Sequence, residues 1–137
     1  MARTELTLAG KPRQRKWFEF RDSESNPWVV KLVLGWIEHN GEHCRGITEL
    51  DKRKILISAM QTRSEVEETF WHESIHMACG LRVATSNTQV EESKVDALES
   101  VEEHIAYASE RNLKAMARSM GWLFPSLPRG VKLKANT

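Results

Sequence analysis

The stretch that constrains the fold most strongly runs from Ser64 to Gly80 and reads SEVEETFWHESIHMACG. Ser64 followed by Glu67 fits a capping box, in which the hydroxyl accepts a hydrogen bond from an unpaired amide and the glutamate reaches back. Glutamates in the first turn suit the positive end of a helix dipole, and Gly80 stands where a helix C-terminus is expected. These signals predict one helix over residues 64–79. Its apolar side chains spread around most of the circumference, which is typical of a buried helix.

Within this predicted helix lies an HExxH motif, His72-Glu73-Ser74-Ile75-His76. Two histidines four residues apart project from one helix face, where a single tetrahedral zinc ion can bind both imidazoles. Glu73 lies about 100° further round the helix, so it can reach a water molecule beside the metal without being a ligand. Zinc lowers the pKa of such a water towards about 7. The motif therefore predicts His72 and His76 as zinc ligands and Glu73 as general base.

Chance is a poor explanation for this motif. With five histidines in 137 residues, a fortuitous HExxH is about a 2% event over the whole chain. Burying two histidines and a glutamate together also costs free energy unless something pairs them. The competing interpretation, ordinary histidines beside an ion-pairing glutamate with no metal, is therefore less favoured.

A catalytic zinc site also needs a third protein ligand and an open position. The metzincin pattern would place a histidine six residues after His76, where this chain has Arg82. Metzincins are therefore excluded. Cys79 belongs to the same straight helix as the two histidines and is interpreted as a packing residue. The remaining donors lie on a second predicted helix, over about residues 90–120 and broken near Asn112.

The apolar seam of this second helix ranks its carboxylates. Counting about 100° per residue from Leu98 places Glu102 inside the seam. Glu99 and Glu103 flank the seam on one side. Because a carboxylate on a buried face needs a cation, Glu102 is expected to be the third zinc ligand, with Glu103 as the second choice. Glu99 is expected to hold a ligand imidazole through a hydrogen bond.

The rest of the chain is rich in strand signals. Trp17–Phe20 and Trp28–Leu34 contain aromatic and β-branched residues, and the polar segment between them predicts a turn. Residues 47–50 and 54–58 predict a second pair of strands. The polar stretch Glu38–Gly46, which separates the two pairs, is expected to be a loop. The fold class is therefore α+β, with a small, mostly antiparallel sheet packed on the HExxH helix and on a second long helix that carries the third ligand.

A chain of 137 residues suits a single domain with its own core. Residues 1–14 are basic and lack periodicity, so they are expected to form a flexible leader. Residues 15–122 are expected to form the domain, and residues 123–137, which contain two prolines, a C-terminal tail. The longest apolar run is too short to span a membrane and no secretory signal is evident, which favours a cytoplasmic location.

Composition says less about partners. The formal net charge of +1 gives no overall case for nucleic-acid binding, so nucleic acid is not the expected partner. The two basic ends are interpreted as solvated segments. Cys44 and Cys79 are expected to stay reduced, since nothing in the sequence indicates a disulfide framework.

Taken together, these residues give the chain a resemblance to the minimal gluzincin-type HExxH proteins, which include the ImmA/IrrE-like peptidases and short phage-encoded metallopeptidases. The resemblance covers roughly residues 46–113. It is carried by the hairpin into Lys54–Ser58, by Thr69–His76 and by Glu102–Ala106. It implies a zincin-like fold, zinc held by the two histidines and one of the paired glutamates, and an edge strand before the active helix that pairs with an extended peptide.

The function that follows as an expectation is a zinc-dependent metallopeptidase that hydrolyses peptide or protein substrates with Glu73 as base. The alternative is a zincin-fold metal-binding protein that acts by protein or nucleic-acid contact without catalysis. Four residues are candidates for stabilising a developing oxyanion, and the sequence does not choose among Tyr107, His104, His43 and Arg82.

Overall fold

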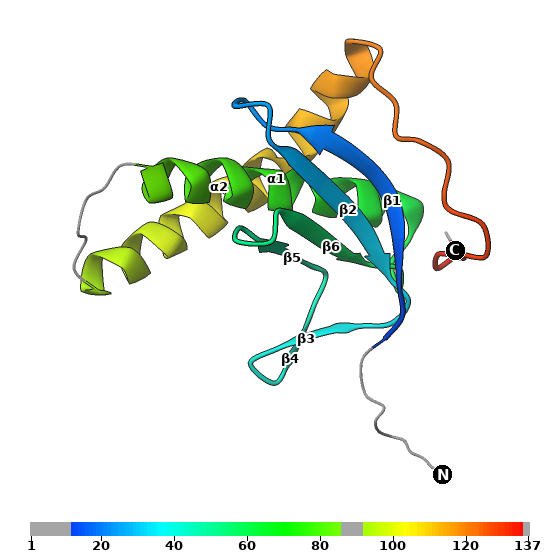
Figure 1. Ribbon diagram of the computed structural model, residues 1–137, viewed down its shortest axis with the longest axis horizontal. Coiled ribbons are helices and arrows are strands. Elements are labelled where there is room, and N and C mark those ends of the chain that lie inside the picture. The colour runs from blue at the N-terminus through cyan, green and yellow to red at the C-terminus, as the bar shows by residue number, and fades with distance from the viewer. Residues whose placement is uncertain (1–11, 86–91, 136–137) are drawn as a thin grey trace.

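The computed structural model describes residues 12–85 and 92–135, with side chains described for residues 12–80 and 102–135. Its strands and helices follow one another along the chain as drawn in Figure 1. In order, they are β1 (Gln14–Arg21), β2 (Pro27–Val33), β3 (Ile37–His39), β4 (Glu42–Cys44), β5 (Gly46–Glu49), β6 (Lys54–Ser58), α1 (Arg63–Thr85) and α2 (Glu92–Ser119).

Four strands form one sheet in the order β1-β2-β6-β5. The outer pairs, β1 with β2 and β5 with β6, are antiparallel, whereas β2 and β6 are parallel. Helix α1 packs on the sheet through β5 and β6, and α2 packs on α1 (Figure 1). The prediction of an α+β fold with a small, mostly antiparallel sheet is confirmed.

The polar stretch expected as a loop is instead a β-hairpin, with β3 paired antiparallel to β4. Its turn is Asn40-Gly41, and both residues have positive φ, 52° and 79°. Asn-Gly is the strongest two-residue signal for a hairpin, because both residues tolerate the left-handed conformation that a type I′ turn requires. The loop prediction was wrong because it weighed the polarity of the stretch above this dipeptide.

The capping box of α1 lies two residues earlier than predicted. The amide of Thr62 donates to Oε1 of Glu65 at 2.9 Å, and the amide of Glu65 donates to Oγ1 of Thr62 at 3.2 Å. The hydroxyl of Ser64 instead contacts the side chain of Glu68. Thr62 is therefore the N-cap, and α1 begins at Arg63 rather than Ser64.

Gly80 does not end α1, which continues to Thr85. A Cβ atom at Gly80 would lie 2.5 Å from Cδ1 of Leu50, in the turn between β5 and β6. A larger residue here would therefore displace the Leu50 side chain, so glycine favours close packing of this turn against the helix. Glycine here serves the packing of two elements, which the sequence signal for a helix end does not distinguish.

Helix α2 runs unbroken past Asn112 and ends as predicted at Gly121, which has a φ of 87°. The amide of Trp122 donates to the carbonyl of Ala117 at 2.9 Å, and that of Gly121 to the carbonyl of Arg118 at 3.0 Å. These two bonds are those of a Schellman motif.

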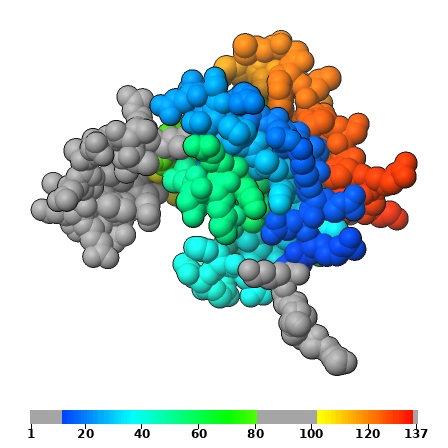
Figure 2. All heavy atoms as spheres, in the orientation of Figure 1, coloured from blue at the N-terminus to red at the C-terminus, as the bar shows by residue number. Residues whose placement is uncertain are grey.

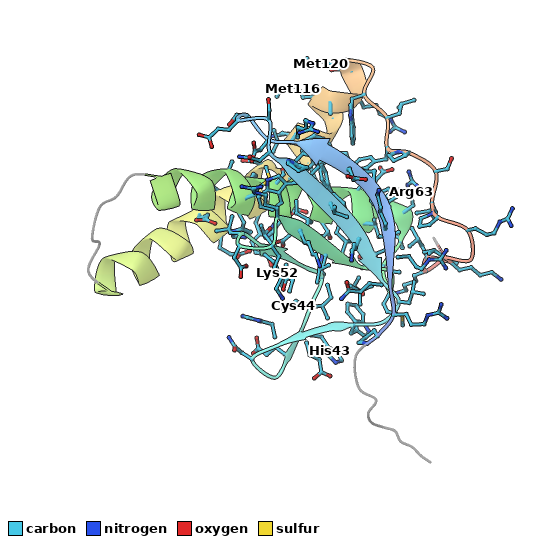
Figure 3. All side chains as sticks on the ribbon, in the orientation of Figure 1. His43, Cys44, Lys52, Arg63, Met116 and Met120 are labelled. Carbon is cyan, nitrogen blue, oxygen red and sulfur yellow. The ribbon has the colours of Figure 1, made fainter. Side chains whose placement is uncertain are left out.

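The predicted apolar seam of α2 is not its buried face. Ile105, Met116 and Met120 are 48%, 54% and 79% exposed, whereas Ala106 is fully buried and Glu110 is 5% exposed. Figure 3 shows Met116 and Met120 near the C-terminal end of the helix. The face of α2 that meets α1 therefore carries carboxylates and a small residue, and a ranking built on the apolar stripe starts from the wrong face.

The residues expected to form a C-terminal tail pack against the domain over their described part, 123–135. Val131 is buried, and Phe124 stacks on Trp17 with ring centroids 5.3 Å apart. The indole of Trp17 also donates to the carbonyl of Pro125 at 3.1 Å. Figure 2 shows this orange-to-red segment beside the blue strand β1.

The expected leader, residues 1–14, lies mostly outside the described residues, but Gln14 already belongs to β1. Among the described elements, neither helix is long and apolar enough to cross a membrane.

Candidate metal centre

The HExxH motif lies in the middle of α1, on the side that faces α2. The Nε2 atoms of His72 and His76 are 3.3 Å apart. His72 is buried at 8% exposure, and His76 is half-buried. Residues four apart on a helix lie one turn apart on the same face, which brings the two imidazoles together.

Glu103 of α2 completes a three-residue cluster with the two histidines. Its Oε1 lies 2.6 Å from Nε2 of His72, and its Oε2 lies 3.1 Å from Nε2 of His76. One ligand atom from each residue can be chosen so that all three lie within 4.8 Å of one another. The donor atoms of two elements therefore converge on one point.

The three residues could hold a metal ion, and their nitrogen and oxygen donors are of the kind that zinc binds. Zinc binds imidazole nitrogen and carboxylate oxygen at about 2.0–2.2 Å, so neighbouring tetrahedral donors lie about 3.3 Å apart. The Nε2 atoms of the two histidines are 3.3 Å apart, and Nε2 of His76 lies 3.1 Å from Oε2 of Glu103. Both distances are close to this donor–donor spacing. The 2.6 Å from His72 to Glu103 is that of a charge-assisted hydrogen bond.

Both imidazoles have a carboxylate on their other nitrogen. Nδ1 of His76 lies 2.5 Å from Oε1 of Glu102, and Nδ1 of His72 lies 3.4 Å from Oε1 of Glu110. Histidines that bind metal ions commonly donate their other N–H to a carboxylate, which fixes the tautomer and the ring orientation. Each Nε2 is thereby left to face the shared point.

The two glutamates that the sequence ranked first and second as the third ligand therefore occupy different positions around the histidines. Glu103, the second choice for the third ligand, belongs to the cluster, whereas Glu102, the first choice, lies on the far nitrogen of His76. Glu99 is part of α2, but its side chain lies outside the described residues. Cys79, interpreted as a packing residue, is half-buried and not part of the cluster.

Sequence reasoning missed Glu110 as a partner of His72. Glu103, Ala106 and Glu110 are spaced i, i+3 and i+7 and share one face of α2. Fully buried Ala106 stands between the two glutamates. A small residue between two acidic residues at this spacing was the available signal, because it marks where two helices approach closely and where carboxylates face inward.

The catalytic candidate Glu73 is buried against β5. It is 6% exposed, and Oγ1 of Thr48 lies 2.9 Å from its Oε1. Burial raises the pKa of Glu73; the hydrogen bond from Thr48 and the nearby histidines oppose this effect without cancelling it. A raised pKa suits a general base that works near neutral pH.

Gly46 is what allows β5 to approach α1 so closely at this point. A Cβ atom there would lie 2.6 Å from Cγ2 of Thr69 and 3.1 Å from Cγ of Glu73. Any larger residue would push the strand, and Thr48 with it, away from the base.

The site opens into a groove of about 1180 Å³ that is lined by the β3–β4 hairpin, β5, the β5–β6 turn and both helices. The strand directly before α1 is β6, which is paired on both sides and cannot accept a further strand. The edge strands of the sheet are β1 and β5, and β5 lines the groove. The resemblance implied that the strand directly before the active helix is an edge strand. This expectation was wrong, because the edge strand at the groove is β5, which precedes β6 in the chain.

Of the four residues considered for stabilising an oxyanion, two line the groove. The ring of Tyr107 lines the groove with its centroid 4.5 Å from that of His72. His43, labelled in Figure 3, also lines the groove from the β3–β4 hairpin, and its ring stacks on Trp36. His104 is exposed outside the groove lining, and the side chain of Arg82 lies outside the described residues.

The chain matches no family model, no curated protein and no solved structure. Its functional interpretation therefore rests on the geometry of its own residues.

Proposed function

We propose that this chain is a zinc-dependent metallopeptidase with a gluzincin-type site on a zincin-like fold. The observation that carries the proposal is the convergence of His72, His76 and Glu103 from two helices on one point, with Glu73 buried beside it. His72, His76 and Glu103 would hold the zinc ion. Glu102, placed first by the sequence ranking, instead positions the imidazole of His76.

The electrostatics of the site favour a cation. The carboxylates of Glu73, Glu102, Glu103 and Glu110 surround two histidines, and carboxylates this close are costly to keep charged without positive charge between them. Burial lowers the pKa of His76, but the hydrogen bond to Glu102 and the surrounding carboxylates outweigh it, so the pKa is raised overall. A divalent cation at the shared point relieves the same excess of negative charge.

Bound zinc would supply Lewis-acid chemistry, by polarising a peptide carbonyl and acidifying water. The chain's own residues supply the rest. Glu73, whose Oε1 accepts a hydrogen bond from Oγ1 of Thr48, accepts a proton from the attacking water and passes it to the leaving amine nitrogen. Tyr107 of α2 lines the groove beside His72, and its hydroxyl would donate a hydrogen bond to the developing oxyanion. The free edge of β5 pairs with an extended peptide substrate.

The test is a Glu73→Gln variant, which keeps the shape of the side chain but removes the base. We expect it to bind zinc as the wild type does and to lose peptide hydrolysis by about 100- to 10,000-fold, the usual contribution of general base catalysis. Hydrolysis would be measured by mass spectrometry on a proteome-derived peptide mixture with one equivalent of zinc.

Glu68→Gln is the matched control, because Glu68 is a glutamate of α1 that pairs with Lys114 away from the groove. This variant should cleave the same peptides as the wild type. If the wild type binds zinc but cleaves no peptide, the metal serves a non-catalytic role, and the chain acts by contact with a partner. If Glu73→Gln cleaves at the wild-type rate, Glu73 is not the base.

A further inference from the structure

A continuous set of polar side chains leads from the start of β5 to His72. Three of its members are among the most buried polar residues described: Gln61, Thr69 and Glu110, at 2%, 1% and 5% exposure. The fourth is Arg45, which directly precedes β5 and lines the groove. Buried polar groups are costly unless all their hydrogen bonds are made, so such a network deserves a physical account.

The side-chain amide of Gln61 hydrogen-bonds both the side chain and the main-chain carbonyl of Arg45. Its Oε1 accepts from Nε of Arg45 at 3.0 Å and from Oγ1 of Thr69 at 3.1 Å. Its Nε2 donates to the carbonyls of Arg45 and Ser58, at 3.1 Å and 2.9 Å. All four hydrogen-bonding positions of the amide are therefore filled, which fixes its orientation.

The guanidinium of Arg45 in turn offsets the negative charge of a buried carboxylate, that of Glu110. Its Nη2 lies 3.2 Å from Oγ1 of Thr69 and 3.4 Å from Oε2 of Glu110. Glu110 uses its other oxygen, Oε1, to face Nδ1 of His72 at 3.4 Å. Among the described side chains, Arg45 is the one lysine or arginine that pairs with this carboxylate.

We infer that Glu110, held in place by Arg45, is a positioning residue for the metal-binding imidazole of His72. Glu110 accepts the Nδ1–H of His72 and so selects the tautomer whose Nε2 is free to bind a metal ion. The inference rests on the proposed zinc site. It goes beyond that site by making zinc affinity depend on a residue at the start of the groove's edge strand, 27 positions before His72.

The test measures zinc affinity by competition with a chromophoric chelator, together with the visible absorption spectrum of the cobalt-loaded protein. Removing a hydrogen-bond partner of a ligand histidine commonly lowers metal affinity by about 10- to 100-fold. We expect this loss in Glu110→Ala, with a changed cobalt spectrum. Glu110→Gln retains a carbonyl that can accept from Nδ1–H, so we expect a smaller loss.

Glu68→Gln is the control for a general effect on helix packing. Like Glu110, Glu68 is a carboxylate between α1 and α2 that pairs with a cation, but it contacts neither histidine. Its zinc affinity should stay within about two-fold of the wild type even where its unfolding temperature falls.

A double-mutant cycle tests whether Arg45 acts through Glu110. Arg45→Met alone should weaken zinc binding, and Arg45→Met combined with Glu110→Ala should bind zinc no more weakly than Glu110→Ala alone. Strictly additive losses would show that Arg45 does not act through Glu110. Wild-type affinity in folded Glu110→Ala, or an equal loss in Glu68→Gln, would overturn the positioning role while leaving the zinc site intact. A wild-type chain that binds no zinc would overturn the zinc site itself, and the inference with it.

Discussion

At the residue scale, the two neighbouring glutamates of α2 differ in what they face. Glu103 points both oxygens at the Nε2 atoms of the histidine pair, whereas Glu102 contacts Nδ1 of His76. Adjacent residues on a helix project about 100° apart, so one reaches the shared point and the other reaches behind the imidazole. The same charge therefore serves two different roles one residue apart.

Alanine variants of these two glutamates should separate the roles by zinc affinity. Glu102→Ala removes a hydrogen-bond partner of His76 and should lower affinity by about 10- to 100-fold. Glu103→Ala removes a ligand and should lower it further than that. Both would be measured by chelator competition. A larger loss in Glu102→Ala than in Glu103→Ala would restore the order that the sequence suggested.

The sequence identified the residues of the motif but not their surroundings. His72, Glu73 and His76 lie on one short stretch of helix, so their mutual geometry follows from helical periodicity. Glu110 and Arg45 meet His72 only because α2 docks on α1 with its carboxylate face inward. That rotation depends on tertiary packing around Ala106, and its one local sign is the small residue between Glu103 and Glu110 on the same helix face.

At the scale of single elements, α1 depends on how its first turn is capped. Hydrogen bonds from Thr62, first from its amide and then from its hydroxyl, hold the pKa of Glu65 below its ordinary value of 4.5. A carboxylate whose pKa is lower in the folded state stabilises that state above its unfolded pKa, and the contribution disappears as the pH falls through the folded pKa.

Thr62→Ala should therefore destabilise the protein by about 1 kcal/mol, the usual contribution of an N-cap side chain. Glu65→Gln should be less stable than the wild type at pH 7, and the difference should shrink as the pH falls below 4.5. Urea unfolding at several pH values measures both. Ser64→Ala is the control; a larger effect there than in Thr62→Ala would place the cap where the sequence pattern suggested.

Sequence patterns predicted the four strands of the main sheet, missed the β3–β4 hairpin and were unreliable for the ends of helices. The strand pairs flanking residues 22–26 and 50–53 follow from β-branched runs separated by turn residues, and the structure confirms both. Gly80 and Gly121 both occupy positions that suit a helix stop, but only Gly121 has the positive φ that ends a helix. Gly80 instead leaves room for the side chain of Leu50, which comes from the turn between β5 and β6.

At the scale of the whole molecule, the C-terminal segment closes an aromatic core. The ring of Phe124 contacts three other aromatic rings. It stacks on Trp17 of β1 and meets Phe70 of α1 edge-on, and its centroid lies 4.6 Å from that of Trp122, just after α2. Two prolines predict irregular backbone here, and the segment is irregular. Its packing could not be predicted, because the apolar residues of an irregular segment carry no periodicity.

Phe124→Ala should therefore destabilise the domain by about 2–3 kcal/mol, somewhat less than for a fully buried phenylalanine because the ring is half-buried. Leu123→Ala is the matched control one residue away, since Leu123 is 70% exposed; it should change stability by less than about 0.5 kcal/mol. Thermal unfolding of both variants gives the comparison. Equal effects would mean that the segment does not contribute to the core.

Zinc bound by His72 and His76 of α1 and by Glu103 of α2 would join the two helices. The most direct test of this site is anomalous X-ray diffraction at the zinc edge, from crystals grown with one equivalent of zinc. We predict one strong peak about 2.0–2.2 Å from Nε2 of both histidines and from a carboxylate oxygen of Glu103. A peak elsewhere, or density at these residues with no anomalous signal, would contradict the zinc site.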